Sequence, residues 1–184
     1  MIEVRFHGRG GQGVVVASEV LARAAFRMGL EVSSFPFFGV ERRGAPVTAY
    51  ARIDSKPIRI RSSIYEPDYV VVLDSGLLKA VNVIEGLKPG GRVLVNFPDG
   101  RELDGLPNSF RRFRIDATAI AAAHGIGSLT APIVNTAIMG GFAKMCEVVS
   151  LDSILESIRE LAPSKKEENV AAAREAYEKT SEVI

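Results

Sequence analysis

A glycine-rich loop between a strand pattern and a helix pattern is the feature that most constrains how this chain folds. Residues 2–7, IEVRFH, have the character of a strand, and the loop GRGGQG follows directly. From Gly13 onward, apolar residues recur at helical spacing as far as Gly29, where a helix is expected to end. A strand, a glycine turn and a helix in this order form the first half of a βαβ unit. The sequence therefore predicts an α/β fold.

The rest of the chain continues this alternation. The run YVVVL at 69–73 is apolar throughout, which is typical of a parallel strand covered on both faces. No repeat, low-complexity tract or domain boundary interrupts residues 1–184. The prediction is one α/β domain with a Rossmann-like open sheet, mostly parallel, and helices on both faces. Strands are expected at 31–37, 47–53, 69–73, 92–96 and 110–116, and helices at 77–87, at 117–124 after the capping Asp116, at 132–148, after Ser150 and Asp152, and at 164–183.

Composition excludes several classes of protein. The 184 residues are 47% hydrophobic and 24% charged, which is the ordinary globular range. A net charge of +1 gives no whole-domain field that would attract nucleic acid or an anionic membrane. No signal peptide is visible and no apolar run has the length of a bilayer span. We expect a soluble, cytoplasmic protein without nucleic-acid or membrane partners.

The sequence shows no catalytic constellation or metal site of its own. Cys146 is the single cysteine, which excludes an intrachain disulfide and a four-thiolate zinc or iron–sulfur site. His7 and His124 lack the spacing of metal ligands, and no serine lies in a nucleophile elbow. Asp74 follows a predicted strand and fits either a general base or, more simply, a turn or helix cap.

The glycine loop matches the pattern G-x-G-x-x-G at Gly8, Gly10 and Gly13. Bare amides and a helix N-terminus supply the partial positive charge that a phosphate group needs. A nicotinamide dinucleotide would also need an acidic residue at the end of the second strand, but Glu31 lies at the wrong end. Of three possible roles for the loop, phosphate binding is therefore favoured over a purely structural turn that lets the helix pack on the strand. Both of these roles are favoured over NAD binding.

The segment FPFFGVERRGAPV, residues 35–47, combines aromatic and charged residues. Aromatic residues and arginine are enriched in protein interfaces, so we interpret the segment as a contact with partner subunits. In the alternative, the phenylalanines fold back onto this chain's own sheet and the arginines stay solvated. Phe35, which lies within the predicted strand, is expected to do so. The predicted interface residues are Phe37, Phe38, Glu41, Arg42 and Arg43.

The blocks GRGGQGVVVASEVLARAA, FPFFGVERRGAPVTAYARI and PDYVVVLD together resemble the gamma subunit of 2-oxoacid:ferredoxin oxidoreductases, in particular the pyruvate and 2-oxoisovalerate types. The resemblance continues more loosely to the end of the chain. It implies oxidative decarboxylation of a 2-oxoacid in a complex with alpha, beta and delta subunits and ferredoxin. Thiamine diphosphate and [4Fe-4S] clusters would then belong to the partner subunits. It also implies contact with coenzyme A, whose pyrophosphate would lie at Gly8, Arg9, Gly10, Gln12 and Gly13, with Asn96 and Asn135 nearby.

Two other functions stay open at this point. One is a stand-alone NAD-dependent dehydrogenase, which the missing ribose-binding acid and the missing acid/base pair disfavour. The other is a purely structural subunit in which the glycine loop is vestigial. Binding of coenzyme A separates the subunit of an enzyme from the structural subunit.

Overall fold

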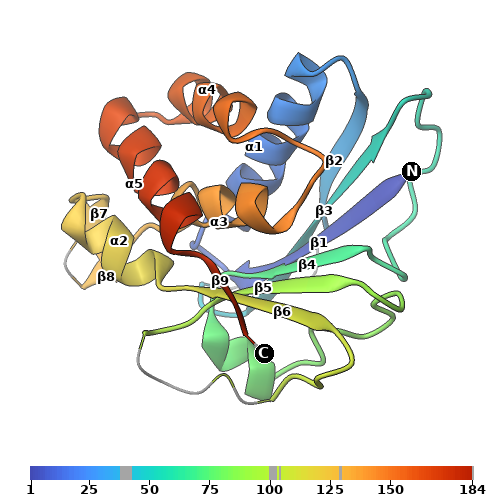
Figure 1. Ribbon diagram of the computed structural model, residues 1–184, viewed down its shortest axis with the longest axis horizontal. Coiled ribbons are helices and arrows are strands. Elements are labelled where there is room, and N and C mark those ends of the chain that lie inside the picture. The colour runs from blue at the N-terminus through green and yellow to red at the C-terminus, as the bar shows by residue number, and fades with distance from the viewer. Residues whose placement is uncertain (38–42, 100–102, 104, 129, 184) are drawn as a thin grey trace.

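The centre of the molecule is a seven-stranded sheet in the order β2-β3-β1-β4-β5-β6-β9 (Figure 1). This computed structural model describes residues 1–37, 43–99, 103, 105–128 and 130–183. A separate two-stranded hairpin joins β7 (Gly127–Ser128) to β8 (Ala131–Pro132). The strands of the main sheet are β1 (Ile2–Arg9), β2 (Glu31–Phe37), β3 (Pro46–Asp54), β4 (Tyr69–Val72), β5 (Arg92–Asn96), β6 (Arg111–Ile115) and β9 (Ser181–Val183).

The middle of the sheet is parallel and its edges are antiparallel. Strands β1, β4, β5 and β6 pair side by side in parallel. At one edge β3 pairs antiparallel with both β1 and β2, and at the other edge β9 pairs antiparallel with β6. The predicted α/β class and open sheet are confirmed, with antiparallel additions on both sides of the parallel centre.

The helices divide unequally between the two faces of the sheet. The α-helices gather on one face, which Figure 1 shows above the sheet, whereas the 3-10 helix η1 (Ser75–Lys79) lies below it. The expected helices on both faces are therefore present in an asymmetric form. The α-helices are α1 (Val14–Arg27), α2 (Ala117–Ala123), α3 (Ala137–Met145), α4 (Leu151–Leu161) and α5 (Lys166–Lys179).

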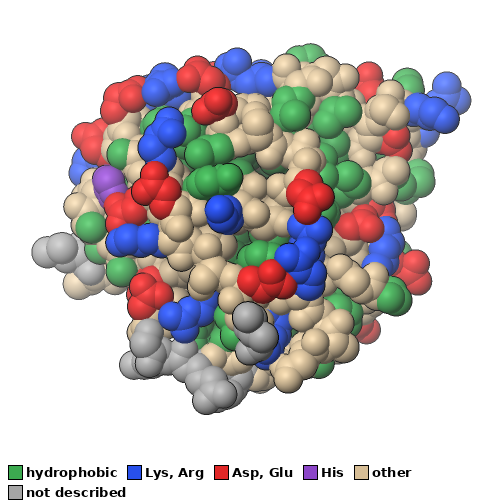
Figure 2. Space-filling model, in the orientation of Figure 1, with side chains coloured by type: hydrophobic (Ala, Val, Ile, Leu, Met, Phe, Trp, Pro, Cys, Tyr) green, Lys and Arg blue, Asp and Glu red, His purple; other side chains and the backbone are tan. Residues whose placement is uncertain are grey.

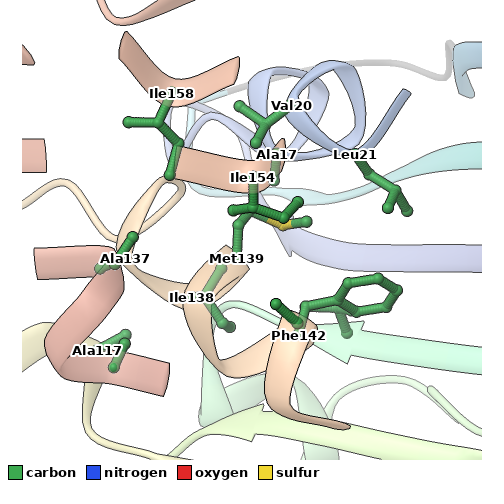
Figure 3. Packing of buried hydrophobic residues seen from close by; sticks show 14 of the residues in the cluster. Ala17, Val20, Leu21, Ala117, Ala137, Ile138, Met139, Phe142, Ile154 and Ile158 are labelled. Atoms are coloured by element: carbon green, nitrogen blue, oxygen red, sulfur yellow. The ribbon is translucent and has the colours of Figure 1, made fainter. Parts of the chain in front are cut away.

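The helical face holds the larger apolar core, in which α3 is central (Figure 3). Phe142 on α3 lies 6.3 Å from Phe6 of β1, measured between ring centroids. A Cβ atom built on Gly140 would lie 1.7 Å from the carbonyl oxygen of Ala173 on α5. The absence of a side chain at Gly140 therefore lets the two helices approach until one backbone touches the other.

The opposite face contains buried arginines as well as apolar residues. Arg52 of β3 is 2% exposed and Arg5 of β1 is 7% exposed. Arg52 donates to the carbonyl oxygens of Ile60 and Ser63, and Arg5 donates to the carbonyl oxygens of Ile64 and Val83. These irregular stretches are not α-helical, so carbonyl groups without a helical donor accept from side chains of the sheet.

Three predicted helices are wrong in extent. The helix expected at 77–87 is η1 followed by turns, because the carbonyl groups of Val83 and Glu85 accept from Arg5 and Gly86 turns at φ 69°. The helix expected at 132–148 begins only with α3, since Pro132 pairs with Gly127 in the hairpin. The helix expected at 164–183 ends with α5, and the chain then extends into β9, where pairing with β6 replaces helical hydrogen bonds.

The surface carries charges of both signs. Figure 2 shows acidic and basic side chains interspersed over the visible face rather than gathered by sign. Several of them pair across elements, as Arg27 of α1 does with Glu160 of α4 at 2.9 Å. No helix in the described part of the chain is long and apolar enough to cross a membrane.

Candidate functional site

The candidate site lies where the central parallel strands end. From the carboxyl end of β1 the chain runs through α1 to the β2 edge, and from the carboxyl end of β4 it runs through η1 to β5 on the other side. In open α/β sheets such a divergence creates a crevice, and ligands bind there. The glycine loop after β1 and Asp74 after β4 face this crevice from neighbouring strands.

A wide cleft of about 1260 Å³ opens at this edge. Its volume exceeds what most small substrates need, and it is open to solvent on one side. One wall is formed by the glycine loop and the turn after β4, and the other by the start of α2 and the segment around β8. The residues that line it are Gly10, Gly11, Gln12, Arg43, Leu73, Asp74, Ser75, Asn96, Pro98, Asp116, Thr118, Ala119, Ala122, Thr130, Ala131, Pro132, Ile133 and Val134.

The two long polar side chains of the glycine loop bind within the chain. Arg9 Nε lies 3.1 Å and Gln12 Nε2 lies 3.0 Å from the same oxygen, Oδ2 of Asp74. Gln12 Oε1 accepts from the backbone amide of Arg9 at 2.7 Å, and the backbone amide of Gln12 donates to the carbonyl of Arg9 at 3.0 Å. Arg9 and Gln12 thus shape the loop through Asp74.

The loop is also joined to the turn that precedes β3. The amide of Gly10 donates to the carbonyl of Ala45 at 2.9 Å, and the amide of Gly44 donates to the carbonyl of Gly10 at 3.1 Å. Arg9 Nη1 adds a bond to the Gly44 carbonyl at 3.1 Å. The glycine loop and residues 44–45 are therefore joined by three hydrogen bonds, and the Gly10 amide already has an acceptor.

The N-terminus of α1 is the part of the loop that offers free polar backbone. Gly13 is the N-cap residue, with φ 76°, and no side chain of the described residues caps the helix. A Cβ at Gly13 would lie 2.1 Å from Nδ2 of Asn135, and a Cβ at Gly8 would lie 2.4 Å from Val14. Glycine is therefore required at both positions by close packing, and at Gly13 also by its backbone conformation.

Asn135 is the polar side chain nearest to this helix N-terminus. It is 7% exposed, and its amide makes no hydrogen bond to any residue that the structure describes. An uncapped helix N-terminus carries a partial positive charge, and an amide donor beside it adds to its affinity for anions. Gly13 and Asn135 together have the properties of an anion site.

Asn96 has a different role in the wall of the cleft. Its Nδ2 donates to the carbonyl of Leu73 and to the Thr118 hydroxyl, both at 2.9 Å, and its Oδ1 accepts from the amide of Thr118 at 3.3 Å. Asn96 therefore ties β4 and β5 to the start of α2. The structure brings it to the cleft, as expected, with its hydrogen-bonding capacity already used by protein groups.

The predicted interface segment is described only in part. Phe38, Glu41 and Arg42 lie outside the described residues. Phe35 packs on Tyr50 of its own sheet, as expected, with ring centroids 5.2 Å apart, while Phe37 is 52% exposed at the end of edge strand β2. Arg43 lies at the rim of the cleft. The described part of the segment thus extends from the edge of the sheet to the candidate site.

His7 and Cys146 are buried away from any nucleophilic role. Burial and the neighbouring Arg5 charge lower the pKa of His7 to about 3, and Arg5 Nε donates to His7 Nε2 at 3.1 Å. Burial raises the pKa of the Cys146 thiol. Within the described ranges, no three His, Cys, Asp or Glu side chains gather as metal ligands would.

Sequence reasoning misses two features of the site. The bond of Asp74 to the glycine loop joins residues more than sixty positions apart, and no local pattern signals it. The second wall, from Ala119 and Ala122 to Ile133, has the sequence pattern of two helices rather than of a cleft. Its only sequence signal is a run of small residues at the start of α2, which leaves room for a cleft.

The comparisons with known proteins agree with one another. The family model described as pyruvate ferredoxin/flavodoxin oxidoreductase matches residues 3–179. The pyruvate/ketoisovalerate oxidoreductases common subunit gamma of Pyrococcus furiosus is 55% identical over 184 residues, covering 98% of this chain and 97% of that relative.

Two solved structures extend the comparison. The crystal structure of pyruvate oxidoreductase subunit PORC from Thermotoga maritima has a TM-score of 0.81 at 32% identity, over 100% of this chain and 98% of that chain. A 2-oxoglutarate:ferredoxin oxidoreductase from Magnetococcus marinus, solved with 2-oxoglutarate, coenzyme A and succinyl-CoA bound, shares the fold with a TM-score of 0.71 at 22% identity, over 97% of this chain and 30% of that chain. On the match of its sequence from end to end, this chain belongs to the pyruvate ferredoxin/flavodoxin oxidoreductase family.

Proposed function

We propose that this chain is the gamma subunit of a 2-oxoacid:ferredoxin oxidoreductase that acts on pyruvate or a branched-chain 2-oxoacid, and that it forms part of the coenzyme A site. In that complex a 2-oxoacid, coenzyme A and oxidised ferredoxin give acyl-CoA, carbon dioxide and reduced ferredoxin. The extent and the identity of the match with gamma subunits support the first part. Alpha, beta and delta subunits are the proposed partners, and they would hold thiamine diphosphate and the iron–sulfur clusters.

The observation that carries the coenzyme A site is the uncapped N-terminus of α1, with Gly13 and Asn135. Their chain neighbours Gln12 and Val134 line the cleft of about 1260 Å³. Coenzyme A is a long molecule with a charged diphosphate. The helix N-terminus would attract the diphosphate, and the cleft would accommodate the remainder of the molecule. A neighbour of the same fold was solved with coenzyme A bound, which is consistent with this proposal. Within the strand β2, the single acidic residue is Glu31, opposite Asp54 at the end remote from the loop. A nicotinamide ribose would find no acid where it needs one.

The substitution Asn135→Asp tests the coenzyme A site. It replaces an amide with a carboxylate of the same shape, and a negative charge beside a helix N-terminus does not disfavour the helix. The carboxylate would repel phosphate and remove a donor, so we expect the affinity for coenzyme A to fall about ten- to hundredfold. Calorimetry on the assembled complex measures this change, and thermal unfolding of the chain should stay close to that of the wild type.

An unchanged affinity for coenzyme A in Asn135→Asp would place the nucleotide elsewhere on the complex. Tight binding of NADH by the wild-type chain would favour a dehydrogenase instead. Loss of affinity together with loss of folding would be resolved by Asn135→Ala, which removes the donor without adding a charge and should weaken binding by a smaller factor.

We also propose that the segment from Phe37 to Arg43 contacts the partner subunits. Phe37 is a large apolar side chain exposed at the end of edge strand β2, and Arg43 lines the cleft. In the same reconstituted complex, Phe37→Ser should reduce co-purification of the partner subunits while leaving the melting temperature of this chain nearly unchanged. Full co-purification would restrict Phe37 to a role within its own sheet.

A further inference from the structure

We propose that Asp74 is a positioning residue for coenzyme A, one that holds the glycine loop in its binding conformation through Arg9 and Gln12 without touching the ligand's phosphates. This inference rests on the proposed coenzyme A site at Gly13 and Asn135. Asp74 stands at the end of β4, the strand next to β1, so it reaches the loop across one strand spacing.

The carboxylate of Asp74 is held in place by three hydrogen bonds from its neighbours. Oδ2 receives two side-chain donors of the loop, Arg9 Nε at 3.1 Å and Gln12 Nε2 at 3.0 Å. Oδ1 accepts from the amide of Gly76 at 2.9 Å, which fixes the carboxylate to the start of η1. Only an ionised carboxylate accepts all three of these donors at once, because an amide in its place would turn a donor toward one of them.

Gln12 carries the effect from Asp74 to the loop backbone. One end of its side-chain amide is held by Asp74, and the other end, Oε1, accepts from the backbone amide of Arg9 at 2.7 Å. This bond closes the loop into a turn in which Gly11 and Gly13 have φ values of 93° and 76°. Without Asp74, the side-chain amide of Gln12 would keep its bond to the Arg9 backbone amide but lose its other fixed contact, so the turn would be held less firmly.

Arg9 serves the same arrangement with its charge. Its guanidinium pairs with Asp74 and donates to the Gly44 carbonyl, so it neutralises a carboxylate that lines the cleft. An unpaired carboxylate at that place would repel a diphosphate. The pairing of Asp74 with Arg9 thus removes an unpaired negative charge from the neighbourhood of the anion site at Gly13 and Asn135.

The two explanations of Asp74 predict opposite signs, which makes Asp74→Asn a sharp test. If Asp74 acts only as a nearby negative charge, its removal should tighten coenzyme A binding. If it positions the loop, we expect the KM for coenzyme A in the reconstituted complex to rise about tenfold, with kcat and the KM for the 2-oxoacid unchanged. Glu182→Gln is the control, because Glu182 is paired with Arg111 at the far edge of the sheet and should leave all three constants unchanged.

A second variant guards against misfolding. Arg9→Lys keeps the positive charge but lacks the forked donors to Asp74 and Gly44, so it should also raise the KM for coenzyme A. In Asp74→Asn, a lower KM for coenzyme A, an unchanged KM for coenzyme A, or a fall in kcat with both KM values unchanged would each overturn the positioning role. If Asn135→Asp raises the KM while Asp74→Asn does not, the coenzyme A site stands and only the role of Asp74 fails. If neither variant changes the KM, the proposed site itself is wrong.

Discussion

The two faces of the sheet are covered in different ways, and each way demands a different chemistry from the strands. The helical face meets α-helices, whose backbone groups bond to one another, so the strands present apolar side chains such as Val4 and Phe6. The opposite face meets η1, turns and extended segments, and some carbonyl groups there accept from side chains of the sheet instead of helical amides. There the same strand β1 presents Arg5, which donates to the carbonyls of those segments.

This difference shows that buried arginine can take the place of a covering helix. A buried carbonyl without a donor costs free energy comparable to a lost hydrogen bond, and one guanidinium can satisfy several carbonyls at once. Arg52 contacts Ile60 and Ser63 in this way and also pairs with Glu3 at 2.8 Å. The helical face depends on close packing, whereas the opposite face combines a smaller apolar cluster with hydrogen bonds made by a few buried arginines.

The largest expected effect is at Arg52 on the opposite face. Arg52→Met removes the donor to two carbonyls and leaves the largely buried Glu3 with only the more distant Lys88, at 3.9 Å, so the free energy of unfolding should fall by about 3–5 kcal/mol. Urea unfolding of the purified chain measures this change. The matched control is Arg111→Met, which breaks an exposed pair with Glu182 and should cost less than about 1 kcal/mol. Equal effects in the two variants would remove the distinction between the faces.

A smaller loss is expected on the helical face, at the contact of α3 with α5. In Gly140→Ala the new methyl group would meet the carbonyl oxygen of Ala173, a backbone atom that cannot move alone, and we expect about 2–3 kcal/mol of destabilisation. Gly141→Ala is the control on the same helix. Its methyl group meets the hydroxyl of Thr180 at 2.7 Å, a side-chain atom that can move if it gives up its bond to the Ala176 carbonyl, so the loss should be smaller than for a backbone contact. If Gly141→Ala proves the more damaging, backbone contact is not what limits this face.

The smallest effect is a pH dependence of stability that comes from His7, a buried titratable residue on the opposite face. His7, on the opposite face beside Arg5, has a pKa of about 3 in the folded chain, against an ordinary histidine value of 6.5. As pH falls below 6.5 the unfolded chain binds a proton that the folded chain does not, so stability present above pH 6.5 is lost progressively toward pH 3. Between pH 6.5 and pH 5 this loss amounts to about 2 kcal/mol. His7→Gln should remove that part of the pH dependence of urea unfolding. An unaltered profile would mean that His7 is protonated as readily in the folded chain as in the unfolded chain.

Local signals are sufficient to predict much of the fold. The strand, glycine loop and helix at the start of the chain are predictable because hydrophobic period and glycine placement are local properties. The caps at Asp116 and Ser150 are predictable for the same reason, and both accept from backbone amides as expected. The path after η1 could not be predicted, since the bonds that fix it come from Arg5, which lies about eighty residues away in sequence.

The candidate site is predictable in its position but not in its bonds. The glycine loop and the strand ends identify the correct edge of the sheet, and Gly10, Gln12 and Asn96 do line the cleft there. Sequence leaves Asp74 between a base and a cap. Its actual contacts depend on the register of β1 against β4, which brings Arg9 and Gln12 to its carboxylate. Register is a property of the folded sheet that the sequence pattern does not display.

The close contact between α3 and α5 has a consequence for synthesis of the chain in the cell. All residues of helix α3 except Lys144 are buried, and α5, which packs on it, follows about twenty residues later. Since the ribosome delivers the chain from its N-terminus, α3 emerges before its cover exists and exposes Ile138, Met139 and Phe142 for a time. During that interval the nascent chain exposes an apolar helix that is prone to aggregation. Chaperones that bind such segments would act after α3 leaves the ribosome and before α5 docks on it.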